Sequence, residues 1–169
     1  MDIKFDRVYE ITVSSIESPY CFYVQIEDFH PDFVEFENAL QKHYEKQRLQ
    51  SGLVLLEQPQ LGQICVAKCC EKNHWYRARI KEIYEHSVRV FFIDYGNEEI
   101  ISIYGNLLLL HKQFSLFPHM AVSCCLNGIK PLPDASLNDI NSFLLDSMMG
   151  KLVAKFIQKV IFGSNFNFN

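Results

Sequence analysis

Cysteine is the residue type in this chain with the widest range of possible chemistry, because cysteines could hold a metal ion or form disulfides. The six cysteines are Cys21, Cys65, Cys69, Cys70, Cys124 and Cys125. Four of them form two adjacent pairs and no C-x-x-C spacing occurs, so neither a zinc site nor a disulfide framework is predicted. The histidines are scattered and indicate no site. We therefore expect buried free thiols in a reducing compartment, and no metal or cofactor.

The charge and hydropathy of the chain limit its partners. The 169 residues carry a formal net charge of −4 with a pI of about 5.8. This balance gives no basic footprint for nucleic acid and favours a cationic partner. No apolar run reaches membrane-spanning length, and residues 1–6 lack the apolar core of a signal peptide. The sequence predicts a cytoplasmic piece with no direct contact to nucleic acid or membrane, and is consistent with a fragment of a longer chain.

The stretch from residue 89 to residue 101 gives the clearest structural signal. It opens with β-branched and aromatic residues, which are typical of a strand buried on both faces. Gly96 and Asn97 then permit the positive φ of a tight turn before a second strand. Residues 62–68 and 75–80 predict two further strands with a polar connection between them. Together these four short strands predict a small curled sheet.

A second set of elements precedes this sheet. Residues 7–14 and 20–26 alternate apolar and polar side chains and predict an antiparallel hairpin. A helix is expected from Pro31 to about Gly52, because Pro suits a first helical turn. Its apolar stripe consists of Phe33, Phe36, Leu40 and Tyr44.

Further elements follow the sheet. Residues 104–118 are expected to pack on the sheet as turns or a short helix. Strands are predicted at 121–126 and 151–157, and between them a helix that starts at the S-x-x-D capping box of Ser136 and stops at Gly150. Neither flank is large enough to bury its own apolar face. We therefore expect the flanks to complete one another in a mainly β, α+β fold.

The order of the central motifs resembles the Tudor domain. V-A-K is followed by W-Y-R-A-R-I and then by V-F-F-I-D-Y-G-N-E-E. With its flanks, the chain is similar to the extended Tudor domain of germline Tudor proteins, in which a Tudor β-barrel is inserted into a split OB fold like that of staphylococcal nuclease. The A-x-x-C-x-L segment from Ala121 and the G-I-x-P segment from Gly128 extend this resemblance. It implies a barrel at 61–112 and a split subdomain with two helices at 1–60 and 113–169.

The resemblance also implies a function. Such domains are peptide-binding modules that read methylated arginine, best symmetric dimethylarginine, in arginine-rich tails of Piwi-class Argonautes, and they act as scaffolds of the piRNA pathway in cytoplasmic germline granules (nuage). A dimethylguanidinium stays charged but is less hydrated, so aromatic faces stack on it well. The matching cage residues are Tyr76, Phe92, Tyr95 and Asn97. Strand alternation puts Phe92 on the opposite face from Phe91 and Ile93, and predicts that the latter two belong to the core while Phe92 is available to a ligand.

One cage position departs from the family pattern. An aromatic commonly follows the A-K pair in the family, whereas Cys69 follows Ala67-Lys68 here, in a hairpin about one residue longer than expected. A thiol has no π face. The cage then either binds methylarginine weakly, or accepts unmodified arginine, or has another role as a modification-independent scaffold.

The same residues also have structural explanations. Tyr76, Phe92 and Tyr95 could be barrel core, and Asn97 could simply suit the turn. The resemblance favours Asp94 with Arg77 as an ion pair that braces the barrel. Glu98 and Glu99 are expected at a solvated edge, where they could form an acidic rim beside a cationic peptide.

An enzymatic function is the remaining alternative, because nuclease-like OB folds can cleave nucleic acid. Phosphodiester hydrolysis needs clustered carboxylates and arginines. The flanking segments contain only scattered ones, and the net charge disfavours a polyanion. We therefore expect no enzymatic activity.

Overall fold

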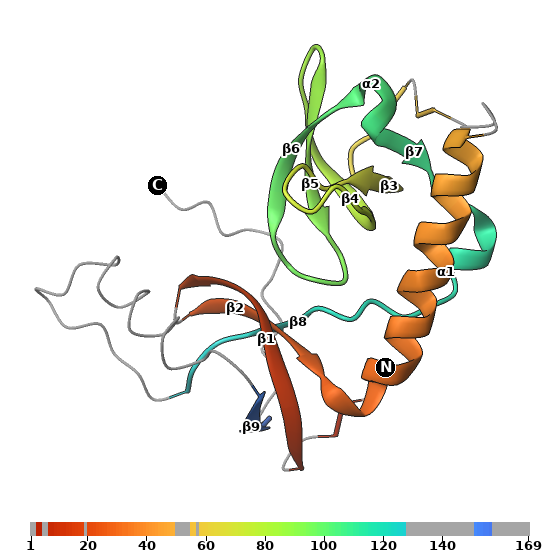
Figure 1. Ribbon diagram of the computed structural model, residues 1–169. Helices are drawn as coiled ribbons and strands as arrows, with labels where there is room; N and C mark the ends of the chain where they lie inside the picture. The colour runs from red at the N-terminus through yellow and green to blue at the C-terminus, as the bar shows by residue number, and fades with distance from the viewer. Residues whose placement is uncertain are drawn as a thin grey trace, which may run out of the picture.

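The computed structural model describes residues 3–4, 7–18, 20–49, 55–56, 58–127 and 151–156. These residues form two antiparallel sheets, with the helix α1 (His30–Leu49) running along one side of the molecule (Figure 1). The predicted helix between residues 136 and 149 and the C-terminal residues after 156 lie outside the described residues. The chain is mainly β, as predicted.

The first sheet combines strands from both ends of the chain. It contains β1 (Val8–Ser18), β2 (Cys21–Ile26), β8 (Val122–Cys124) and β9 (Lys151–Lys155), in the order β8-β2-β1-β9. The predicted hairpin is confirmed, because β1 and β2 pair antiparallel. Alternation decides its inner face: Tyr9 and Ile11 are buried, whereas Val8 is 55% exposed. A one-turn 3-10 helix, η1 (Glu27–Phe29), leads from β2 into α1.

The second sheet is the curled barrel. It contains β3 (Ile64–Lys68), β4 (Trp75–Ile83), β5 (Ser87–Phe92), β6 (Glu98–Ser102) and β7 (Leu107–Leu109), in the order β6-β5-β4-β3-β7. The four strands predicted here are confirmed. A short helix, α2 (Ile103–Asn106), precedes β7.

Residues 107–109 differ from the prediction, which placed them in turns or a short helix. They form the fifth barrel strand, with Leu107 opposite Ala67 and Leu108 opposite Val66. Leu107 belongs to the barrel interior, while Leu108 packs on the side of α1. A short run of leucines has no period of its own, so the choice between strand and helix depended on the open edge of β3.

Helix α1 covers one side of the barrel through the predicted apolar stripe. Phe33, Leu40 and Tyr44 are each at most 2% exposed, and Leu40 and Tyr44 pack with Trp75 and Leu108. The Tyr44 hydroxyl donates to the backbone oxygen of Leu109 at 2.9 Å and accepts from the backbone N–H of His111 at 2.8 Å. A second 3-10 turn, η2 (Lys112–Phe114), follows.

The turn between β5 and β6 is where the barrel meets the first sheet. The side-chain amide of Gln25 donates to the backbone oxygen of Asp94, and the hydroxyl of Ser14 donates to that of Tyr95, both at 2.7 Å. Gly96 has φ +91°, and a Cβ there would stand 2.1 Å from Cγ of Tyr23. Gly96 is therefore required twice, by the turn and by the close approach of β2.

Candidate functional site

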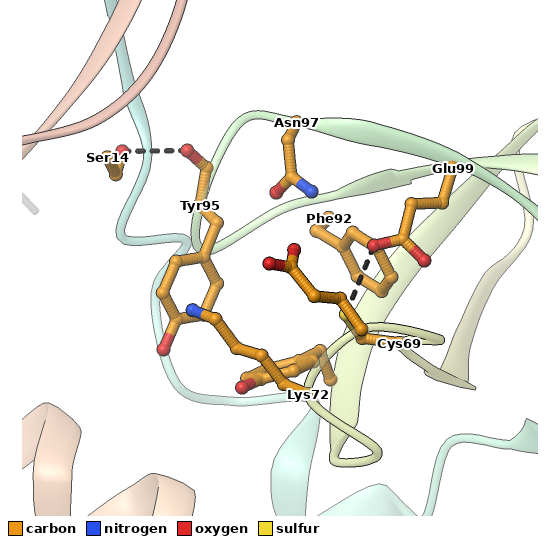
Figure 2. Close-up of a pocket in the computed structure, with 9 residues that line it drawn as sticks. Ser14, Cys69, Lys72, Phe92, Tyr95, Asn97 and Glu99 are labelled. Carbon is orange, nitrogen blue, oxygen red and sulfur yellow. Dashed lines mark hydrogen bonds between the residues drawn. The ribbon is translucent and has the colours of Figure 1, made fainter.

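A pocket of about 230 Å³ opens between the β3–β4 hairpin and the β5–β6 turn, facing the first sheet (Figure 2). Its lining comprises Ser14, Cys69, Glu71, Lys72, Tyr76, Phe92, Tyr95, Asn97 and Glu99. All five residues predicted from the sequence for peptide binding are in this set. Of the four residues predicted as rim or brace, the lining includes Glu99 but not Arg77, Asp94 or Glu98.

Three aromatic rings meet in the pocket at steep angles. Tyr76 lies 5.7 Å from Phe92 and 5.1 Å from Tyr95, measured between ring centroids, with interplanar angles of 75° and 77°. Tyr76 and Tyr95 are half-buried. Burial is the main cause that raises the pKa of Tyr76 to about 12, so both walls are neutral phenols near neutral pH. The side-chain amide of Asn97 points into the same space (Figure 2).

Phe92 occupies a different environment from the one the sequence predicted. It is 2% exposed and belongs to the barrel interior together with Val88 and Val90. Phe91, which was expected in the core, is half-buried and packs on Tyr23 of the first sheet with centroids 5.4 Å apart. The alternation was predicted correctly, but the inner face was not. Phe92 thus contributes only a small exposed area to the pocket.

Cys69 and Glu99 form the wall opposite Tyr95. The thiol of Cys69 donates to Oε1 of Glu99 at 3.0 Å, and the backbone N–H of Cys70 donates to Oε2 at 3.2 Å. Burial, with a further effect from the Glu99 hydrogen bond, raises the pKa of the Cys69 thiol, which therefore stays protonated and can donate. Where an aromatic ring would close the cage, this chain presents a thiol and a fixed carboxylate.

Helix α1 holds the Tyr95 wall in place. The Tyr95 hydroxyl donates to Oε1 of Glu37 at 2.5 Å, and the Tyr95 ring packs on Phe33 with centroids 6.0 Å apart. Burial is the largest cause that raises the pKa of Glu37, and the hydrogen bond from Tyr95 opposes it. The orientation of this ring is therefore fixed from outside the barrel.

Arg77 and Asp94 form a buried ion pair and do not line the pocket. Arg77 is 1% and Asp94 3% exposed, and the guanidinium donates to Oδ1 at 2.6 Å and to Oδ2 at 2.9 Å. Its remaining N–H groups donate to the backbone oxygens of Phe114, Phe117 and Pro118. The backbone N–H of Met120 donates to Asp94. With its five donors satisfied, Arg77 ties the chain after η2 to the barrel.

Several residues of the site were missed from the sequence. Ser14, Glu71 and Lys72 line the pocket, and Glu37 supports Tyr95 from outside. The long β3–β4 hairpin was the one available signal for Lys72, since an extra residue there extends the turn toward the pocket. Ser14 and Glu37 gave none, because their positions depend on the packing of β1 and α1 against the barrel.

Two structural observations limit other kinds of site. The described residues contain no group of three or more His, Cys, Asp or Glu side chains placed to hold a metal ion. Within the same part of the chain, no helix is both long and apolar enough to cross a membrane.

Comparison with known proteins places the chain among Tudor proteins. The family model of the Tudor domain matches residues 3–128. Tudor domain-containing 6 of Danio rerio is 32% identical over 119 residues, which are 70% of this chain and 5% of that protein. Human Tudor domain-containing protein 1 is 32% identical over 120 residues, 70% of this chain and 10% of that protein. The chain thus spans a small part of the curated relatives it matches.

Solved structures agree with the fold. The human TDRD1 extended Tudor domain, in complex with a symmetrically dimethylated peptide, has a TM-score of 0.83 at 24% identity, over 95% of this chain and 78% of that one. A variant of the Drosophila melanogaster Papi extended Tudor domain, in complex with an unmethylated Piwi N-terminal peptide, has a TM-score of 0.79 at 25% identity, over 90% and 76%. The chain therefore belongs to the Tudor domain family and has the fold of an extended Tudor domain.

Proposed function

We propose that this domain is a non-enzymatic peptide-binding module that reads dimethylarginine in arginine-rich protein tails. The observation that carries the proposal is the pocket itself, where Tyr76 and Tyr95 stand 5.1 Å apart at 77° with the Asn97 amide beside them. A flat, weakly hydrated cation can stack on one ring and meet the other edge-on, with a gain of roughly 0.5–2 kcal/mol per good contact. The amide oxygen can accept a remaining guanidinium N–H.

The solved relatives support the choice of ligand and partner. The human TDRD1 domain was solved with a symmetrically dimethylated peptide, and a mouse TDRD1 domain with a MILI peptide that contains dimethylarginine. By analogy, the partner of this domain is the tail of a Piwi-class Argonaute or a similar protein, and its setting is the piRNA pathway in cytoplasmic germline granules.

One observation favours a second candidate, the recognition of unmodified arginine. The Glu99 carboxylate is held in the pocket by Cys69 and Cys70, at the place where a ring would complete the cage. A carboxylate pairs best with a guanidinium that offers two parallel N–H groups, and methylation removes such donors. The Papi relative solved with an unmethylated peptide supports this candidate.

A single titration series separates the two candidates. The same Arg-Gly peptide is measured in unmodified, monomethyl, symmetric dimethyl and asymmetric dimethyl forms. We expect affinity on the order of micromolar or weaker, because the interface is small. A preference for symmetric dimethylarginine supports the first candidate, and a preference for unmodified arginine that Glu99→Gln abolishes supports the second.

Variants of the pocket show whether the titration reports on this site. Tyr76→Leu removes a π face but keeps an apolar side chain, and should weaken binding by about 1–2 kcal/mol. Tyr104→Ala is the matched control, since Tyr104 is 67% exposed and lies outside the pocket lining. Equal affinity of Tyr76→Leu and the wild type would exclude the pocket as the binding site and point to a modification-independent scaffold surface.

A further inference from the structure

A lysine of the same chain reaches into the aromatic pocket. Lys72 lies in the β3–β4 hairpin, and its Nζ stands 5.3 Å from the centroid of the Tyr95 ring (Figure 2). This is the contact that a bound guanidinium would make with the same ring under the proposed function. In the absence of a ligand, the site therefore holds a cation of its own.

The hairpin backbone fixes the point from which this lysine extends. The backbone N–H of Cys69 donates to the oxygen of His74, and that of Asn73 donates to the oxygen of Cys69, both at 2.9 Å. Asn73 adopts φ 55°, a conformation that Asn tolerates in tight turns. The imidazole Nδ1 of His74 lies 2.6 Å from the backbone oxygen of Lys72. Because the backbone is held, the ammonium can leave the ring only by rotation within the Lys72 side chain.

The ammonium is held weakly. Among the residues that the structure describes, no ion pair includes Lys72. Glu71 and Glu99 share the pocket lining with it, and its charge opposes the burial that raises the pKa of Glu37. Lys72 is also exposed as a whole residue. A cation–π contact at an exposed position is among the weaker ones, so a ligand can displace the lysine.

We propose that Lys72 is an internal competitor of the arginine site, an inference that rests on the function proposed above. A cationic ligand has to displace the ammonium from Tyr95 before it can stack there. Competition of this kind lowers the affinity for every cationic ligand by the same factor, because the displaced contact is the same in each case. Lys72 therefore sets the ligand concentration at which the site fills, and leaves the order of preference among arginine forms unchanged.

The peptide arm of the test compares Lys72→Met with the wild type. Methionine keeps a long apolar side chain and removes the charge. We expect Lys72→Met to bind the unmodified and the symmetric dimethyl Arg-Gly peptide about two- to fivefold more tightly, by the same factor for both. Lys72→Arg, which retains a stacking cation, should show no gain. Lys81→Met removes an exposed lysine outside the pocket lining and controls for the change in net charge.

The ligand-free arm uses NMR of the Lys72 side chain. Protons of its ε-methylene, held over the Tyr95 ring, should resonate upfield of ordinary lysines, return to normal in Tyr95→Leu, and return to normal when the symmetric dimethyl peptide saturates the wild type. An ordinary shift in the free protein, or an upfield shift that persists at saturation, would overturn the proposal.

The outcomes of the two arms distinguish this inference from the proposed function. Equal peptide affinities of Lys72→Met and the wild type would overturn the competition alone, as would an equal gain in Lys81→Met. Failure of both the wild type and Lys72→Met to bind any arginine peptide would overturn the proposed function, and the competition with it.

Discussion

The hydroxyl of Tyr95 donates a 2.5 Å hydrogen bond to the carboxylate of Glu37, and so links a wall of the pocket to helix α1. Glu37 is half-buried, and burial is the main cause that raises its pKa above the ordinary value of 4.5. The carboxylate therefore orients the ring at a cost in desolvation. This contact makes the pocket a joint product of the barrel and the helix.

The raised pKa of Glu37 predicts a pH-dependent difference between the wild type and Glu37→Gln. A carboxyl group whose pKa is higher in the folded state stabilises the fold below its ordinary value of 4.5, and this contribution is lost as the pH rises through the folded pKa. The free energy of unfolding of the wild type, relative to that of Glu37→Gln, should therefore fall over this rise in pH. Urea denaturation at a series of pH values measures it, and a relative rise would show that the Tyr95 hydrogen bond dominates.

The buried pair of Arg77 and Asp94 should be essential for stability. Arg77→Met leaves the Asp94 charge and three backbone oxygens without their donor, and should cost about 3–5 kcal/mol of unfolding free energy. Arg77→Lys keeps the charge but loses the fork that satisfies both carboxylate oxygens. Chemical denaturation gives both values. Arg89→Lys is the control, because the Arg89 ion pair with Glu82 is exposed and its change should have little effect.

Gly96 should be irreplaceable for a reason that Gly62 does not share. Both have positive φ, +91° and +79°, so alanine is strained at either, by about 1–2 kcal/mol. A Cβ at Gly96 would also stand 2.1 Å from Tyr23, whereas one at Gly62 meets nothing within 4 Å. Gly96→Ala should therefore cost roughly 1–3 kcal/mol more than Gly62→Ala in thermal or chemical denaturation. Equal losses would show that β2 can move away from the turn.

Replacement of Cys69 by phenylalanine tests whether the missing wall limits affinity. A ring at this position would supply the absent π face and would remove the thiol that donates to Glu99. We expect binding of the symmetric dimethyl peptide to strengthen by up to about 1 kcal/mol and binding of the unmodified peptide to gain less. Calorimetric titration measures both. Cys69→Ser keeps a donor for Glu99 without a ring and should not strengthen binding of the symmetric dimethyl peptide.

The boundaries predicted from the sequence can be tested by expressing residues 61–112 alone. This fragment would expose Leu108, which is 1% exposed in the whole chain and packs on the side of α1, so we expect poor solubility or marginal stability. Thermal melting of the fragment beside the full chain measures this. A monomeric fragment with a cooperative transition would show that the barrel folds by itself.

The local features of this protein could be predicted from its sequence. Alternation defined β1 and β2, the apolar stripe defined α1, and the pair Gly96-Asn97 marked the turn that carries one side of the pocket. The spacing of Tyr76, Phe92 and Tyr95 on strands and at a turn followed from the same local rules. These features depend on near neighbours in the chain, whose side chains determine the backbone conformation.

The tertiary structure decided which faces are buried and which distant residues complete the pocket. Alternation separates Phe91 from Phe92 but cannot state which of them points into the barrel, because that depends on where Tyr23 and the first sheet lie. The contacts of Glu37 with Tyr95 and of Glu99 with Cys69 join residues 58 and 30 positions apart. Such contacts form only when separate elements pack together, and no local pattern of residues encodes that packing.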